Sequence, residues 1–234
     1  MADVGKSVIR ENDFVELDYT GKVAESREVF DTTSGFIARE NKIFDENASY
    51  GPVIVCIGKR YLIPGLDKQL VGKETGSKQA FRIASEEAFG KKNAKLIQLV
   101  STAKFRQQQL VPFPGMQVNI DGVVGTVKAV TGGRTIVDFN HPLSGRELEY
   151  EVTVIRIVTD LAEKVKAVLK FIGIRPEAVK VSVTPGSAVL EFPEKVPEQL
   201  KKEIEGKLKS TISGLDSVSF SEKENSGLGS APKQ

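Results

Sequence analysis

The chain has 234 residues, of which 40% are hydrophobic and 27% charged, a composition typical of a soluble globular protein. Its formal net charge of +2 argues against a general nucleic-acid binder, so we expect no nucleic-acid partner. A single cysteine, Cys56, excludes an internal disulfide, and together with the single histidine, His141, it cannot form a Cys/His zinc site. We find no secretory signal and no apolar stretch of about 20 residues, which favours a cytoplasmic protein without membrane contact.

The first third of the chain predicts strands around one short helix. Residues 13–20 alternate apolar and polar side chains, which is typical of a half-buried strand, and residues 28–31 begin a second edge. The uninterrupted apolar run at 53–57 predicts a central strand buried on both faces. A proline opens and a glycine stops the helix expected over 64–70, and residues 79–84 predict a further strand.

The character of the sequence changes after residue 86. Between 91 and 140 there are seven basic and two acidic residues, and two glycine-containing pairs, Asp121-Gly122 and Gly132-Gly133, predict hairpin turns between short strands. An alternating strand returns at 147–154. Beyond it, the spacing of apolar residues and turn signals predicts an αββαβ module over 159–225, and the Gly/Ser-rich residues 226–234 predict a disordered tail.

Five separated segments of the sequence, taken in order, resemble one family. They are VELDYTGK (15–22), VFDTT (29–33), YGPVIVCIGKRYLIPGLDKQLVG (50–72), EEAFG (86–90) and NHPLSGRELEYEV (140–152). Together they are similar to the FKBP-type peptidyl-prolyl cis-trans isomerases. The resemblance implies an α+β fold in which a twisted antiparallel sheet wraps around a short helix.

The same resemblance suggests how the chain is divided. Residues 1–86 and 141–158 would form the isomerase domain, and residues 87–140 resemble the inserted β-rich chaperone module of SlyD-like members. The αββαβ module at 159–225 resembles the C-terminal accessory domain of the long archaeal members. A homodimer through this module is one interpretation, because added α/β modules often present a sheet edge.

The family's site residues can be carried over by matching motifs. The resemblance implies catalytic roles for Asp31, Tyr19 and Phe89, with no metal and no cofactor. The walls of the implied proline pocket are Phe30, Val53, Val55, Leu62, Ile63, Leu66 and Tyr150, and the Ile63 N–H would hold the substrate's prolyl carbonyl. The implied partners are unfolded or partly folded polypeptides that contain X-Pro bonds.

The insert carries more apolar residues than a module of about 50 residues easily hides, which predicts a surface that binds unfolded chains. The residues assigned to that surface are Leu96, Ile97, Phe105, Phe113 and Met116. The alternative is that these residues make the core of the insert itself.

Two other functions remain open at the level of the sequence. Leu66 stands where many family members have tryptophan, and Phe89 stands where a tyrosine is usual, which favours a non-catalytic holdase chaperone on the same scaffold. The basic insert also allows an RNA or ribosome adaptor, whose binding would weaken strongly with salt.

Overall fold

The computed structural model describes residues 7–222, which divide between two compact units. One unit contains residues 7–21, 29–81 and 150–222, and the other contains residues 22–28 and 82–149. The expected disordered tail at 226–234 lies outside the described residues. The architecture is mixed α+β with mostly antiparallel strands, as the sequence predicts, and no helix within residues 7–222 is long and apolar enough to cross a bilayer.

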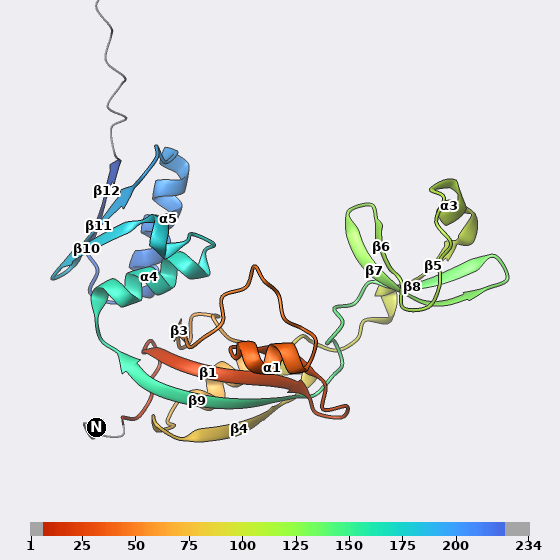
Figure 1. Ribbon diagram of the computed structural model, residues 1–234, viewed down its shortest axis with the longest axis horizontal. Helices are drawn as coiled ribbons and strands as arrows, with labels where there is room; N and C mark the ends of the chain where they lie inside the picture. Colours follow the sequence, from red (N-terminus) through yellow and green to blue (C-terminus); the bar gives the residue numbers. More distant parts are fainter. Residues whose placement is uncertain (1–6, 223–234) are drawn as a thin grey trace, which may run out of the picture. The chain divides into compact units, whose positions relative to one another are not determined.

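A five-stranded sheet dominates the first unit, with strands in the order β2-β1-β9-β4 and β3 paired to β1 (Figure 1). Its elements are β1 (Phe14–Val23), β2 (Val29–Thr32), β3 (Val53–Cys56), β4 (Lys78–Ile83) and β9 (Leu148–Val158). Alternation places Val15 and Leu17 of β1 and Val152 of β9 in the core, because successive side chains of a strand point to opposite faces.

Two short helices accompany this sheet. They are α1 (Gly35–Glu40) and α2 (Pro64–Leu70). Ser34 caps α1 by accepting a hydrogen bond from the Ile37 N–H, which gives the long connection after β2 a helical turn of its own. Helix α2 begins at Pro64, as predicted, and buries Leu66 and Leu70.

Strand β3 differs from its prediction. It pairs antiparallel with β1 alone, with Leu17 opposite Val53 and Phe14 opposite Cys56, so it is an edge strand and the prediction of a central strand is wrong. Its apolar run has another cause, because helix α4 (Leu161–Phe171) packs against β3. Ile54 and Cys56 belong to the hydrophobic cluster that forms at this contact.

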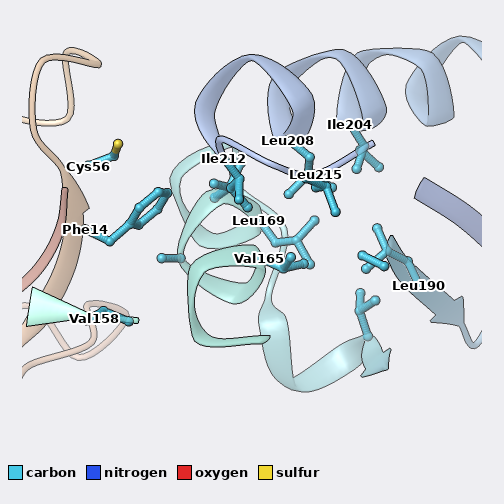
Figure 2. Packing of buried hydrophobic residues seen from close by; sticks show 14 of the residues in the cluster. Phe14, Cys56, Val158, Val165, Leu169, Leu190, Ile204, Leu208, Ile212 and Leu215 are labelled. Atoms are coloured by element: carbon cyan, nitrogen blue, oxygen red, sulfur yellow. The ribbon is translucent and has the colours of Figure 1, made fainter. Parts of the chain in front are cut away.

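The C-terminal elements join the first unit through that cluster. They are α4, η3 (Pro176–Ala178), β10 (Lys180–Thr184), β11 (Ser187–Phe192), α5 (Glu198–Thr211) and β12 (Ser217–Glu222). The three strands form a sheet in the order β10-β11-β12, in which β11 and β12 run parallel. Figure 2 shows Phe14 of β1 pointing toward α4, while Val165 and Leu169 of that helix project on its other side toward Leu190 of β11; one hydrophobic cluster includes all of them, so the two parts share one core.

The second unit is built on a four-stranded antiparallel sheet in the order β5-β8-β7-β6. Its elements are η1 (Ser85–Glu87), η2 (Ala94–Leu96), β5 (Ile97–Ser101), α3 (Thr102–Gln107), β6 (Gln117–Ile120), β7 (Val123–Thr131) and β8 (Arg134–Asp138). Both predicted hairpin turns are confirmed. Asp121 and Gly122 have φ of 53° and 84°, and Gly132 and Gly133 have φ of 55° and 79°, the positive values that two-residue hairpin turns require.

Candidate active site

Three aromatic side chains from neighbouring strands form the centre of the candidate site. The ring of Tyr150 lies 5.9 Å from that of Tyr19 and 5.7 Å from that of Phe30, with the latter pair edge to face. The rings approach closely because Gly21 of β1 lacks a side chain. A Cβ at Gly21 would lie 2.7 Å from Phe30 Cζ and 3.0 Å from Tyr150 Cε1.

The carboxylate of Asp31 is held at the edge of this aromatic group. The Tyr19 hydroxyl donates a hydrogen bond of 2.7 Å to Asp31 Oδ2. Burial, reinforced by the negative charge of Asp31, raises the pKa of Tyr19 well above its ordinary value of 10.0. Burial and the same charge also raise the pKa of Tyr150. Both phenols therefore stay protonated at neutral pH, and Tyr19 is the hydrogen-bond donor to the Asp31 carboxylate.

The beginning of α2 presents a backbone donor. Ile63 is the N-cap residue of α2 and its carbonyl accepts hydrogen bonds from the N–H groups of Leu66 and Asp67. Within residues 7–222 no hydrogen bond is made by the Ile63 N–H itself. This is the amide that the sequence assigns to the prolyl carbonyl. Leu66, one turn further along, is 1% exposed and closes the core beneath it.

A cavity of about 500 Å³ lies in the first unit and takes in part of the predicted pocket. Three of the predicted wall residues line it, namely Val53, Val55 and Leu62, together with Tyr19, which the resemblance places among the catalytic residues. Phe30, Asp31, Ile63, Leu66 and Tyr150 do not line it. Phe30, Asp31 and Tyr150 instead belong to the aromatic and carboxylate group that reaches the cavity through Tyr19.

The cavity also has walls that the sequence prediction missed. Tyr61 and residues of α4 and η3 line it, including Lys166, Lys170 and Phe171. A signal for them exists in the sequence, because Lys166, Lys170 and Phe171 fall on one face of a helix, away from the stripe of Val165, Val168 and Leu169.

Phe89, which the family resemblance places in the pocket, belongs to the second unit. Its ring stacks on that of His141 with centroids 4.3 Å apart and parallel planes. The Phe89 carbonyl accepts a hydrogen bond of 3.0 Å from Ser144 Oγ. These contacts tie together the two segments of chain that lead into and out of the insert.

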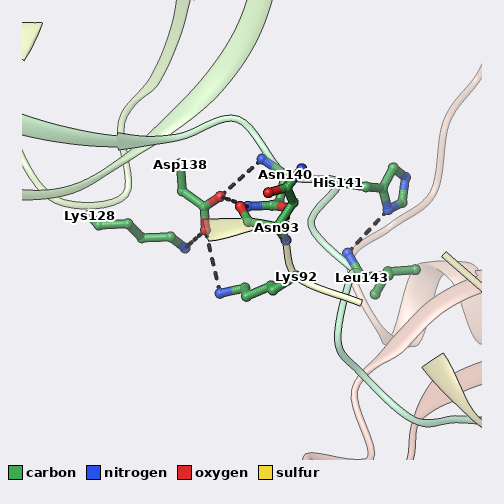
Figure 3. A network of polar contacts seen from close by, with 7 residues as sticks. All are labelled: Lys92, Asn93, Lys128, Asp138, Asn140, His141 and Leu143. Atoms are coloured by element: carbon green, nitrogen blue, oxygen red, sulfur yellow. Dashed lines mark hydrogen bonds and ion pairs between the residues drawn. The ribbon is translucent and has the colours of Figure 1, made fainter. Parts of the chain in front are cut away.

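A polar network fixes the base of the insert (Figure 3). The amide side chain of Asn140 and the backbone of Asn93 exchange hydrogen bonds of 2.8 and 3.0 Å. Asp138, which is buried, accepts from both nitrogens of Asn140 and pairs with Lys92 at 3.4 Å. Burial raises the pKa of Asp138, but these hydrogen bonds outweigh that effect and hold the pKa below its ordinary value. The ends of the insert therefore lie side by side.

The five residues predicted to bind unfolded chains divide into two groups. Leu96, Ile97 and Phe113 are exposed, the last by 60%. Phe105 is only 4% exposed and lies in the core of the insert, so its assignment to a binding surface is wrong, whereas Met116 is partly buried against the same cluster and its assignment stays a prediction. Phe105 points inward because α3 covers the sheet, where it meets Val118, Val127 and Val137.

Two sequence families match this chain. Residues 5–107 match FKBP-type peptidyl-prolyl cis-trans isomerase, and residues 98–143 match the IF domain of FKBP26. The second match covers most of the four-stranded sheet of the second unit.

Individual relatives agree with these matches. A short-type peptidyl-prolyl cis-trans isomerase of Methanocaldococcus jannaschii is 30% identical over 148 residues, which cover 63% of this chain and 93% of that protein. A probable FKBP-type 16 kDa isomerase of Pseudomonas fluorescens is 30% identical over 118 residues, covering 48% of this chain and 77% of that protein. The FKBP-type isomerase SlyD of Haemophilus influenzae is 31% identical over 121 residues, which cover 50% of this chain and 63% of that protein. With the aromatic group around Asp31 and nearly the whole length of one relative matched, the chain belongs to the FKBP-type peptidyl-prolyl cis-trans isomerase family.

Proposed function

We propose that this chain catalyses the cis-trans isomerisation of X-Pro bonds in unfolded or partly folded polypeptides. The observation that carries the proposal is the grouping of Tyr19, Phe30 and Tyr150 around the Asp31 carboxylate, next to a largely apolar cavity. Val53, Val55 and Leu62 supply the apolar wall of that cavity. A proline ring fits such a site because the ring is apolar and carries no backbone N–H.

The apolar walls supply the chemistry that isomerisation needs. The barrier of about 18–20 kcal/mol to rotation about a peptide bond is amide resonance, which separates charge between oxygen and nitrogen and is lost as the bond twists. A site that excludes water disfavours the planar, charge-separated amide relative to the twisted one. The Ile63 N–H, which makes no hydrogen bond within residues 7–222, would hold the prolyl carbonyl. No covalent intermediate is required.

Asp31 has two roles open to it. Its negative charge stabilises positive character at the carbonyl carbon as the bond rotates, and its hydrogen bond from Tyr19 fixes the aromatic wall. Either role makes Asp31 more important to the rate than to folding, because its side chain is exposed.

We further propose that the second unit holds unfolded chains. Its exposed apolar side chains support this activity, since large apolar groups on a surface mark interaction sites. They are Leu96, Ile97, Leu99, Leu110, Val111, Phe113, Val123, Val124 and Val130. Holding a client on the chain that carries the pocket raises the effective concentration of the client's prolines at that pocket.

The test is the refolding of a protein whose slow phase is proline isomerisation, with and without the chain at a hundredth of the client concentration. Acceleration at this level is expected of a catalyst. Asp31→Val is expected to reduce the acceleration on the order of ten-fold while leaving the circular dichroism spectrum and thermal midpoint close to those of the native chain. Tyr19→Phe, which keeps the carboxylate but removes its hydrogen bond, separates the two roles of Asp31.

Two results would contradict the proposal. An unchanged rate with a folded Asp31→Val variant would remove Asp31 from the site. No acceleration, combined with suppression of client aggregation at equal concentrations, would identify a non-catalytic holdase on this scaffold.

A further inference from the structure

One face of helix α4 packs into the hydrophobic core and another face lines the cavity. Val165, Val168 and Leu169 are fully buried in the core shared with β1 and β3. Lys166, Ala167, Lys170 and Phe171 line the cavity instead, together with Glu163 one turn earlier. Because residues three and four apart share one face of a helix, this second stripe forms a continuous wall. The wall faces Tyr19, Val53 and Leu62, which belong to the proposed proline pocket.

Two contacts hold this wall in position. Arg156 of β9 donates two parallel hydrogen bonds to Glu163, of 2.8 and 2.9 Å, and a third of 2.6 Å to Glu16 of β1. At the far end of α4, the ring of Phe171 stacks on that of Tyr61 with centroids 3.8 Å apart. Helix α4 is therefore fixed against the sheet at both ends of the cavity.

Two positive and two negative side chains line the cavity, and one of the negative ones is already engaged in an ion pair. Glu163 is engaged by Arg156, but neither Lys166 nor Lys170 forms an ion pair with any residue between 7 and 222. Both lysines are exposed at the mouth of the cavity, one helical turn apart. Glu177 of η3 is the other acidic side chain in the lining, so with Glu163 engaged by Arg156 it stands against the two lysines.

We propose that the α4 side of this cavity is an extended subsite in which residues flanking the proline of the same substrate chain lie along α4, with preference for an acidic residue facing Lys166 and Lys170. The inference rests on the isomerase function proposed above, because it requires a proline in the neighbouring pocket. Two features identify the occupant. The cavity shares Tyr19 and Leu62 with the proposed proline pocket, and its mostly apolar lining carries Lys166 and Lys170, which form no ion pair among residues 7–222.

The test uses nine-residue peptides with one central proline. In one series a glutamate replaces alanine two to four residues before the proline, and in the other it follows the proline at the same spacing. The native chain is expected to show a kcat/KM about three- to ten-fold higher for the glutamate peptide of one series, the effect of one or two exposed charge pairs. Because such pairs are screened, the preference should shrink in 1 M NaCl.

Variants assign the preference to the wall. Lys166→Ala/Lys170→Ala is expected to bring the ratio of kcat/KM between glutamate and alanine peptides to about one, and Lys166→Glu/Lys170→Glu to favour peptides with lysine at the same position. Lys195→Ala/Lys202→Ala is the matched control. It removes two exposed lysines of the C-terminal elements that do not line the cavity, and the native ratio should persist.

Failure of the inference and failure of the isomerase function give different results. A native chain that isomerises proline peptides equally well with glutamate or alanine at every position overturns the subsite alone. So does a preference that persists in Lys166→Ala/Lys170→Ala. If no peptide is isomerised, the isomerase function fails, and the subsite is then tested by the fluorescence anisotropy of a fluorescein-labelled glutamate peptide. Loss of peptide binding in Lys166→Ala/Lys170→Ala supports the subsite. Unchanged peptide binding in that variant overturns the subsite.

Discussion

Gly21 occupies the tightest position of the candidate site, since a Cβ there would lie 2.7 Å from Phe30 Cζ. Gly21→Ala must push the rings of Phe30 and Tyr150 apart, because real Cβ contacts are never so short. We expect kcat/KM for a proline tetrapeptide to fall about ten-fold, as small displacements of a site cost catalysis heavily. A protease-coupled isomerisation assay measures the loss.

The matched control is the same substitution at Gly206 of α5, where a Cβ would meet nothing within 4 Å. Gly206→Ala should leave kcat/KM unchanged and raise the free energy of unfolding by about 0.5–1 kcal/mol, the ordinary gain in a helix interior. If Gly21→Ala is folded and as active as Gly206→Ala, the aromatic rings do not form the wall of the site.

Cys56 makes the stability of the first unit sensitive to alkaline pH. Its side chain is fully buried beside the carbonyl of Thr211, and burial raises its pKa from 9.0 to about 11. The folded state therefore keeps a proton that the unfolded chain loses, so the contribution is complete below pH 9 and is lost as pH rises toward 11. We expect the thermal midpoint of the native chain to fall more steeply than that of Cys56→Ala across this range, in reducing buffer. Parallel curves would contradict the assignment.

Sequence reasoning named Asp31 and Tyr19 as residues of the candidate site, but not the hydrogen bond that joins them. A carboxylate that follows Phe30 at a strand edge needs a hydrogen-bond donor, so Asp31 stood out. The donor proved to be Tyr19, twelve positions earlier on the neighbouring strand. Periodicity gives the face on which Tyr19 lies, whereas the register between two strands decides which residues meet, and register depends on the whole sheet.

At the scale of elements, one ion-pair group helps to hold α4 on the sheet, in addition to its buried face and the stacking of Phe171 on Tyr61. Arg156 bridges Glu16 of β1 and Glu163 of α4, and the side chains of Arg156 and Glu163 are each 38% exposed. Bidentate geometry strengthens such a pair, while solvent weakens it, so we expect a coupling of about 0.5–1.5 kcal/mol between Arg156→Met and Glu163→Gln. Urea unfolding of the two single variants and the double variant gives this coupling.

The pH dependence of that coupling has a definite sign. The hydrogen bonds from Arg156 lower the pKa of Glu163 below its ordinary value of 4.5. The coupling is therefore present above pH 4.5 and is lost as pH falls through the lower, folded-state value. A coupling within about 0.3 kcal/mol of zero at pH 7 would mean that Arg156 does not position α4.

Elements whose limits are marked by residues inside the segment itself were predicted well, and elements that depend on distant parts of the chain were not. The range Pro64–Leu70 was predicted and observed for α2, because a proline at the first turn and Gly72 beyond its end mark both limits within the segment. For β3 the apolar run was read correctly as a strand and wrongly as a central one. A helix more than a hundred residues later covers it, and no pattern inside residues 53–57 carries that information.

The insert shows the same limit. Its hairpins were predictable from glycine pairs, whereas α3 lies in a stretch without clean periodicity and was not expected. That omission placed Phe105 on the surface when it belongs to the core. Exposed and buried apolar residues of a small module cannot be separated until the elements that cover the sheet are known.

The whole molecule, finally, is expected to divide its work between the two units. Because Asn93 and Asn140 hydrogen-bond each other, the ends of the insert are adjacent, and residues 91–139 can be replaced by a short Gly-Ser linker without stretching the chain. If the insert holds clients, this deletion should lower the rate on an unfolded protein by ten-fold or more, on the scale that tethering provides, while the rate on a tetrapeptide changes little. Phe113→Ser, which alters one exposed side chain and leaves the insert in place, should give a smaller loss in the same direction. Equal losses on protein and tetrapeptide would mean instead that the insert supports the pocket and does not recruit clients to it.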